Sequence, residues 1–204
     1  MKRIVFATGN KDKMKEVRQI LDGIGCQIIS MAEAGVDIDI EEDGTTFTEN
    51  AMIKAREVAK HLPEDIVMAD DSGLEIDYLG GEPGIYSARY LGHDTSYHEK
   101  NMNFIQRLEG VPDEERGARF VCAIAAVFPD GTELDTIGYY EGRIGYEEKG
   151  ENGFGYDPVF YLPDVQKYSA ELSDEEKHAR SHRGKALRAM RDKMIELGLG
   201  TEGE

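Results

Sequence analysis

Two adjacent carboxylates, Asp70 and Asp71, follow a short apolar run in residues 66–74 and precede a hydroxyl and a glycine. The apolar run predicts a buried strand that ends at a site, because ligands in open α/β sheets bind beyond the strand ends. Adjacent carboxylates repel one another and lose water on burial, so we expect a compensating cation, first of all a divalent metal ion. The alternative is that both aspartates only cap the following turn.

A second group of candidate residues lies near the N-terminus, where residues 2–7 predict a strand and Asn10 is the expected N-cap of a helix. Lys11, Lys13 and Lys15 crowd the first turn of this helix, where the helix dipole disfavours cations. Such a local conflict is typical of functional sites, and a glycine turn, helix amides and lysines together suit a phosphate group. The chain has no P-loop motif, and a solvated lysine face is the alternative interpretation.

Carboxylates gather a second time in residues 37–44, where apolar and acidic residues alternate before a cluster of three acids. The alternation predicts an edge strand that leads into a turn. A helix predicted over residues 47–62 places Asn50 and Lys54 on one flank at i, i+4 spacing. We therefore expect Lys54 to point into a cleft beside this helix.

The second half of the chain combines loops and paired strands. Residues 80–90 predict a shaped loop whose tyrosines and arginine suit a binding surface or a subunit contact. The turn Pro129-Asp130-Gly131 predicts a hairpin of residues 120–128 and 133–140, which makes the sheet mixed. Phe154 lies between glycines, an arrangement that favours stacking on a planar ligand, although an aromatic loop packed into the core is an alternative.

Two further features precede the C-terminus. Ser173 and Glu176 predict a capping box. His182 and Arg183 are predicted just before a last helix over residues 185–197. Because arginine only donates hydrogen bonds, Arg183 matches a keto oxygen and leaves an amino group unmatched. The alternative is that both side chains lie at the surface, as a single histidine or arginine usually does.

Composition limits the classes of protein to which the chain can belong. With 204 residues, of which 40% are hydrophobic, it can bury a core as one domain or as two lobes that share a sheet. Its net charge of −17 disfavours nucleic acid and anionic membranes as partners. Cys26 and Cys122 lack metal-ligand spacing, so we expect reduced, buried thiols. No signal peptide or membrane span is predicted, and we expect a soluble cytoplasmic protein.

Five motifs, in order along nearly the whole chain, closely resemble those of the inosine/xanthosine triphosphate pyrophosphatases. They are Thr8-Gly9-Asn10 to Lys13, Ala69-Asp70-Asp71-Ser72-Gly73-Leu74, Gly80-Gly81 to Tyr90, Phe154-Gly155-Tyr156-Asp157-Pro158 and Ser181-His182-Arg183. The resemblance implies Mg²⁺-dependent hydrolysis of dITP, ITP and XTP, all deaminated purine nucleoside triphosphates, to monophosphate and pyrophosphate. It also implies a homodimer and an α/β fold: a long mixed β-sheet flanked by helices, in two lobes with the active cleft between them. Residues 1–197 would form this single domain, and residues 198–204 a frayed tail.

The same resemblance assigns roles residue by residue. Asp71 would be the catalytic carboxylate, and it would bind the metal together with Glu41 or Glu42, of which Glu41 is slightly favoured because it is nearest the end of the apolar alternation. Ser72 would contact the substrate. The triphosphate would lie on Thr8, Gly9, Asn10, Lys11, Asp12 and Lys13, with Lys54 nearby. The nucleoside end would be formed by Phe154, Gly155, Tyr156, Asp157, Lys177, His182 and Arg183.

Two other functions remain open at this point. The nearer is a pyrophosphatase of similar architecture that acts on pyrimidine or modified triphosphates, which the Ser181-His182-Arg183 motif disfavours. The more distant is a nucleotide-binding protein without catalytic activity. Asp71, Lys13 and Lys54 disfavour it, because a binding module needs no carboxylate that faces phosphate charge.

Overall fold

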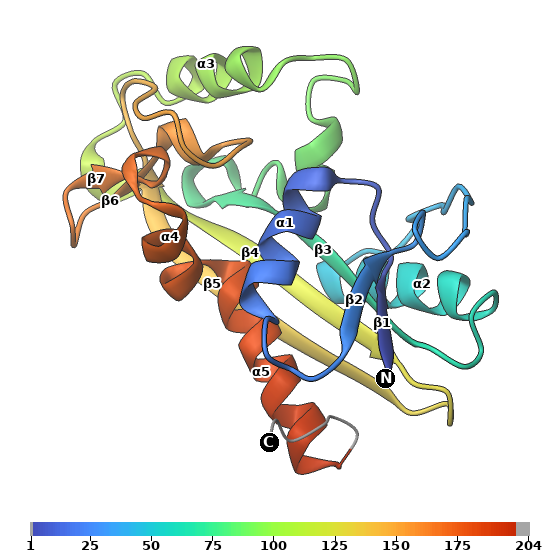
Figure 1. Cartoon of the computed structure of the whole chain (residues 1–204). Helices are drawn as coiled ribbons and strands as arrows, with labels where there is room; N and C mark the ends of the chain where they lie inside the picture. Colours follow the sequence, from blue (N-terminus) through green and yellow to red (C-terminus); the bar gives the residue numbers. More distant parts are fainter. Residues whose placement is uncertain (1, 199–204) are drawn as a thin grey trace. The chain divides into compact units, whose positions relative to one another are not determined.

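The computed structural model describes residues 2–198, and their strands form a mixed sheet of seven strands in the order β2-β1-β3-β4-β5-β6-β7 (Figure 1). The strands are β1 (Arg3–Phe6), β2 (Gln27–Ser30), β3 (Ile66–Ile76), β4 (Gly117–Val127), β5 (Glu133–Ile144), β6 (Phe160–Leu162) and β7 (Lys167–Tyr168). Strand β1 pairs in parallel with β2 and β3, whereas β6 pairs antiparallel with β5 and β7. The predicted mixed sheet is confirmed, and β2 is a strand that the sequence did not predict.

Five α-helices flank these strands within the described residues, which confirms the α/β class. They are α1 (Lys11–Ile20), α2 (Phe47–Ala59), α3 (Tyr97–Arg107), α4 (Asp174–Arg180) and α5 (His182–Glu196). The predicted caps are present: Asn10 Oδ1 accepts hydrogen bonds from the first turn of α1, and Ser173 forms a capping box with Glu176. No helix of residues 2–198 has both the length and the apolarity that crossing a membrane requires.

The chain divides into two compact units, and the boundaries fall within β3, β4, β5 and the first turn of α5. Unit 1 comprises the chain up to Asp71, residues 122–138 and the chain from Arg183 onward, and unit 2 comprises residues 72–121 and 139–182. This division agrees with the two predicted lobes. The single domain over residues 1–197 and the cleft between lobes stay predictions, and all but the first residue of the predicted tail lies outside the described residues.

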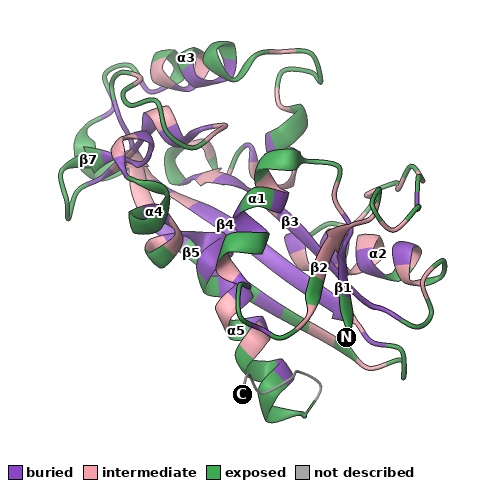
Figure 2. Cartoon of the chain, viewed as in Figure 1, coloured by how far each residue is buried: buried purple, intermediate pink, exposed green. Residues whose placement is uncertain are grey.

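The core of unit 1 shows how a strand divides its side chains between two faces. Ile66 and Met68 of β3 join an apolar cluster with residues of α1 and α5, such as Val17 and Met190. Val67, between them in the chain, is equally buried but does not belong to this cluster, because successive side chains of a strand point to opposite faces. Figure 2 shows how fully β3 and β4 are buried. Even-numbered and odd-numbered residues of β3 therefore face opposite sides of the sheet.

The predictions for residues 37–44 and for the start of the last helix are wrong. Residues 37–44 form no strand, although exposed and half-buried residues still alternate along them. Alternation shows that one side of a segment is covered, and it does not show that the segment pairs with another strand. The last helix begins at His182 and not at Lys185, so His182 and Arg183 lie in its first turn. Gly184 is a poor helix residue, but the burial of this turn outweighs its low propensity.

Both cysteines are free thiols, as predicted. Cys122 is buried in the cluster with α1 and α5, whereas Cys26 is only half-buried at its edge. Burial raises the pKa of the Cys122 thiol to about 12, so this thiol stays protonated at neutral pH. The hairpin of β4 and β5 is also present, with the Phe128 N–H donating to the Thr132 carbonyl across the turn.

Candidate active site

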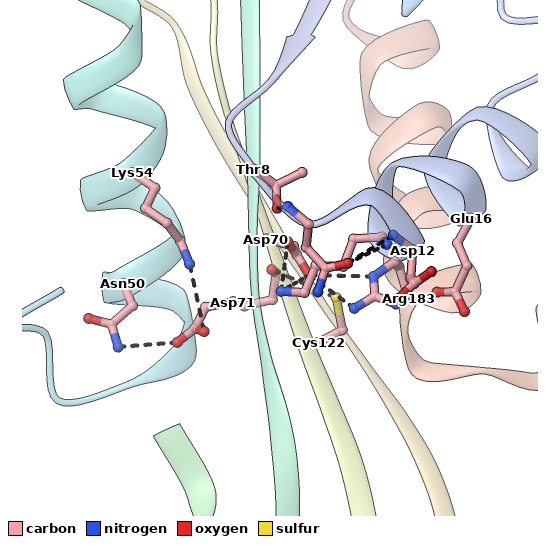
Figure 3. Close-up of polar contacts among 12 residues, drawn as sticks. Thr8, Asp12, Glu16, Asn50, Lys54, Asp70, Asp71, Cys122 and Arg183 are labelled. Atoms are coloured by element: carbon pink, nitrogen blue, oxygen red, sulfur yellow. Dashed lines mark hydrogen bonds and ion pairs between the residues drawn. The ribbon is translucent and has the colours of Figure 1, made fainter. Parts of the chain in front are cut away.

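Strand β3 does not end at its two aspartates, as the sequence predicted, but continues through them to Ile76. Asp70 has the parity of Met68, and Asp71 has the parity of Val67, so the two carboxylates point to opposite faces of the sheet. Figure 3 shows Asn50 and Lys54 on one side of the strand and Glu16 and Arg183 on the other. The neighbouring carboxylates therefore need no shared metal ion to relieve their repulsion.

On the first face, the carboxylate of Asp70 is compensated by two cations. Lys13 Nζ lies 3.0 Å from Asp70 Oδ2, and Arg183 Nη2 lies 3.2 Å from the same oxygen. Arg183 also pairs closely with Glu16 of α1. Burial raises the pKa of Asp70, but Lys13 and Arg183 outweigh burial and hold this pKa well below its usual range. Asp70 is thus fixed in its ionised form.

This pairing explains why α1 tolerates Lys13 in its first turn. The Asn10 side chain already accepts hydrogen bonds from the Asp12 and Lys13 amides, 2.9 and 3.1 Å away. The Lys13 side chain turns inward to Asp70, whereas Lys11 is exposed. The attraction of Asp70 therefore offsets the unfavourable helix dipole at Lys13.

On the second face, Asp71 and Glu42 both contact the ammonium group of Lys54. Glu42 Oε2 lies 2.8 Å and Asp71 Oδ1 3.8 Å from Lys54 Nζ, and Asn50 Nδ2 donates to Asp71 Oδ2 at 3.1 Å. Burial raises the pKa of Asp71 and Glu42 adds to the rise, although Lys54 and Asn50 oppose it. Burial lowers the pKa of Lys54, but the surrounding carboxylates outweigh burial and raise it. These two carboxylates and one ammonium group carry a net negative charge.

The donor set on this face fits a magnesium ion. Mg²⁺ prefers oxygen ligands and is usually held by one or two carboxylates together with substrate phosphates. Glu42 and Asp71 supply two such carboxylates around one lysine. Within residues 2–198, no group of three or more His, Cys, Asp or Glu side chains is arranged to hold a metal ion. Two carboxylates are therefore the donor set to consider here.

The two glutamates that the sequence left as alternatives lie in the acidic turn, residues 41–44, and have different surroundings. Glu42 is half-buried and reaches Lys54, whereas Glu41 is exposed. The period-two pattern of Val36, Ile38 and Ile40 continues to Glu42, and each of these residues is covered. Because the apolar residues of this segment are all even-numbered, the same spacing could have indicated Glu42 from the sequence.

In unit 2, two of the predicted nucleoside-end residues, Phe154 and Lys177, contact the buried carboxylate of a third, Asp157. Asp157 accepts hydrogen bonds from the Phe154 amide at 3.0 Å, from Ser169 Oγ at 2.7 Å and from Lys177 Nζ at 2.7 Å. Lys177 Nζ also lies 5.1 Å from the centroid of the Phe154 ring. A Cβ at residue 153 would lie 2.3 Å from Asp157 Oδ2, so the close approach requires glycine there. Sequence reasoning did not identify Ser169.

The other predicted nucleoside-end residues have different surroundings. The Tyr156 hydroxyl donates to the Ser87 carbonyl at 2.6 Å, and its ring is buried in the core of unit 2. The His182 ring stacks on Phe120 with centroids 5.0 Å apart. Arg183 pairs with Asp70 and Glu16 in unit 1, as described above. Gly155 has a φ of +70°, which favours glycine, and its carbonyl accepts from α3.

Of the remaining predicted residues, Ser72 follows Asp71 on β3 and is half-buried. Thr8 Oγ1 accepts from the Asn10 amide at 3.1 Å, so Thr8 shapes the turn before α1. Gly9, Asn10 and Asp12 are exposed around this turn. Asn50, noted from the sequence only for its helical spacing, contacts Asp71 directly.

The chain matches known proteins over nearly its full length. Residues 4–193 match the Ham1 family. A dITP/XTP pyrophosphatase of Clostridium perfringens (strain 13 / Type A) is 46% identical over 199 residues, which cover 95% of this chain and 98% of that protein. A dITP/XTP pyrophosphatase of Yersinia pestis is 47% identical over 196 residues, covering 94% and 98%.

Solved structures agree with this match. The Staphylococcus aureus Ham1 protein has a TM-score of 0.86 at 40% identity, with 96% of this chain and 100% of that chain covered. A HAM1 protein from Coxiella burnetii has a TM-score of 0.86 at 41% identity, with the same coverage. The fold and the sequence therefore lead to the same group of proteins.

Proposed function

The chain belongs to the Ham1 family, and we propose that it hydrolyses the deaminated purine nucleoside triphosphates dITP, ITP and XTP to the monophosphate and pyrophosphate. The relatives named dITP/XTP pyrophosphatase support this reaction and substrate class. The observation in this chain that carries the proposal is the contact of Asp71 and Glu42 with Lys54. The reaction removes deaminated purines from the nucleotide pool.

The chemistry of phosphate-anhydride cleavage assigns a role to each side chain of this group. Enzymes that transfer phosphoryl groups act chiefly by positioning and by neutralising charge. Lys54 attracts the phosphate oxygens, and Asp71 accepts a proton from the attacking water or orients that water. Mg²⁺, for which Glu42 and Asp71 are the proposed ligands, supplies further charge neutralisation on the phosphates when it is bound.

The attacking water adds to the α-phosphorus in this proposal, because pyrophosphate then leaves in one step. The bond between the α-phosphorus and its bridging oxygen breaks, and that oxygen leaves with the pyrophosphate. Hydrolysis in ¹⁸O-labelled water should therefore place the label in the monophosphate. Label in the pyrophosphate would show attack at the β-phosphorus and contradict the proposal.

For the base, we assign Phe154 as the stacking residue, with Asp157 and Lys177 holding its loop. The hydrogen bonds and the cation–π contact around Asp157 support this role, because they fix the Phe154 backbone and ring. His182 and Arg183 are assigned as donors to the 6-keto oxygen that inosine and xanthine carry and adenine lacks.

We also propose a cytoplasmic homodimer. The exposed Tyr86 in unit 2 is of a residue type enriched at subunit contacts.

A substrate panel tests the proposal. Pyrophosphate release is measured from dITP, XTP, ITP, GTP and ATP with and without Mg²⁺, for the wild-type chain and for Asp71→Asn. We expect rapid, Mg²⁺-dependent release from the first three, which the substitution abolishes. Preference for a pyrimidine or modified triphosphate would overturn the base assignment, and binding without hydrolysis would identify a non-catalytic protein. Light scattering tests the dimer.

A further inference from the structure

The side-chain amide of Asn50 joins two segments that both belong to the proposed site. Asn50 lies one turn into α2 and is only 1% exposed. Its Oδ1 accepts a hydrogen bond from the Gly44 amide at 2.9 Å, and its Nδ2 donates to Asp71 Oδ2 at 3.1 Å. A backbone N–H can only donate and an ionised carboxylate can only accept, so these partners determine the orientation of the amide.

Gly44 supplies an independent observation of how close this junction is. Its backbone is not in the left-handed region, so conformational freedom does not explain the glycine. A Cβ at this position would lie 2.6 Å from Asn50 Oδ1 and 2.8 Å from the Glu49 Cβ. The close approach of α2 to the acidic turn therefore requires glycine at residue 44. This turn also carries Glu42, two residues earlier.

We propose that Asn50 is a positioning residue for the hydrolysis reaction: it orients the carboxylate of Asp71 and holds the turn that carries Glu42. With Oδ2 of Asp71 bound to Asn50, the other oxygen faces Lys54, 3.8 Å away. With the Gly44 amide bound to the same side chain, Glu42 is kept within 2.8 Å of that lysine. This inference rests on the proposed function, because it assigns Asn50 a role in that reaction.

Asn50→Asp separates positioning from a merely structural link. Aspartate has nearly the shape of asparagine and retains the acceptor for the Gly44 amide, but it replaces the donor to Asp71 with a carboxylate oxygen. When both carboxylates are ionised, this oxygen repels Asp71 in place of the lost N–H donor. We expect kcat for dITP to fall by about 10- to 100-fold with KM changed less than about threefold, because small misplacements of reacting groups cost rates of this order.

Val58→Ala is the matched control on the same helix. Val58 is fully buried and lies about two helical turns beyond Asn50, so its truncation weakens the packing of α2 and leaves the side chain of Asn50 in place. We expect this variant to unfold at a lower temperature and to keep the wild-type kcat. A similar loss of kcat in Val58→Ala would show that any weakening of α2 lowers the rate, and would overturn the specific role of Asn50.

Hydrogen exchange of the Gly44 amide gives a readout that needs neither Mg²⁺ nor nucleotide. We expect slow exchange in the wild-type chain and in Asn50→Asp, and fast exchange in Asn50→Ala, which lacks the acceptor. A wild-type kcat in folded Asn50→Asp would overturn the proposal, as would unchanged exchange in Asn50→Ala. Failure of the proposed function is distinct from both, because the wild-type chain itself would then release no pyrophosphate from dITP.

Discussion

Asp70 and Asp71 are neighbours on β3, yet the two faces of the sheet give them different electrostatic surroundings. Asp70 meets Lys13 and Arg183, and Glu16 completes a group of two positive and two negative side chains. Asp71 shares Lys54 with Glu42. The first group is balanced, whereas the second has a surplus of negative charge.

This difference divides structural and chemical roles between two identical side chains. The cations around Asp70 lower its pKa and fix a charge that joins α1 and α5 to the sheet. Burial raises the pKa of Asp71 although Lys54 opposes the rise, so its ionised form is costly until a further cation approaches. The face of Asp71 therefore suits a magnesium ion and phosphate chemistry, and the face of Asp70 supports the residues beside it.

The largest expected effect concerns activity on the face of Asp71. Asp71→Asn should lower kcat for dITP by about 10³-fold, because it removes the proposed base and a proposed metal ligand. Its stability should not fall, since asparagine can accept the Asn50 hydrogen bond and Lys54 keeps Glu42. Pyrophosphate release and thermal unfolding measure the two quantities. Asp43→Asn, in the exposed part of the acidic turn, is the control and should keep full activity.

The second effect concerns stability on the other face. Asp70→Asn should lower the free energy of unfolding by about 3–5 kcal/mol. The substitution removes one of the two carboxylates that compensate the buried charges of Lys13 and Arg183. Denaturant titration measures the change. A loss below about 1 kcal/mol would show that Asp70 is not the residue that balances these cations.

A smaller effect should distinguish the two glutamates of the acidic turn. Glu42→Gln should lower kcat/KM by about 10- to 100-fold and raise the Mg²⁺ concentration required, as for residues that support a metal site. Glu41→Gln should have little effect, because Glu41 is exposed. Magnesium titrations of both variants decide between them. The opposite ranking would restore the preference for Glu41 that the sequence favoured.

The smallest effect concerns base selectivity through Arg183. Arg183→Ala should narrow the preference for ITP over ATP by about tenfold, because the donor to the keto oxygen is lost. Glu16→Gln keeps Arg183 paired with Asp70 and should narrow the preference for ITP over ATP by less. The ratio of kcat/KM values is measured at a temperature where both variants are folded. An unchanged ratio in Arg183→Ala would place the discrimination elsewhere.

Local patterns in the sequence predicted much of the fold. Capping residues located the starts of α1 and α4, and the i, i+4 spacing of Asn50 and Lys54 placed both on the flank of α2 that meets Asp71. These features depend on neighbours within one or two helical turns. A single sequence contains that information.

The placement of Asp70 and Asp71 on opposite faces of the sheet could have been predicted from the sequence but was not. The strand prediction stopped at the carboxylates, although Leu74 and Ile76 continue the buried pattern beyond Gly73. Extending the strand would have placed Asp70 and Asp71 on opposite faces by parity. The partners of Arg183 were out of reach, because 113 residues separate it from Asp70 and 167 from Glu16. Pairing over such separations follows from tertiary packing and not from local pattern.

The dependence of unfolding free energy on pH, measured without Mg²⁺, tests the division of roles most directly. A lowered pKa makes Asp70 stabilising above its unfolded pKa of about 3.9, and this contribution is lost as pH falls through the folded pKa. A raised pKa makes Asp71 favourable only below its unfolded value, and this contribution is lost as pH rises through the folded pKa. Relative to the wild-type chain, Asp70→Asn should therefore lose stability, and Asp71→Asn should gain it, as pH rises from acid to neutral. Changes of the same sign in both variants would contradict the account.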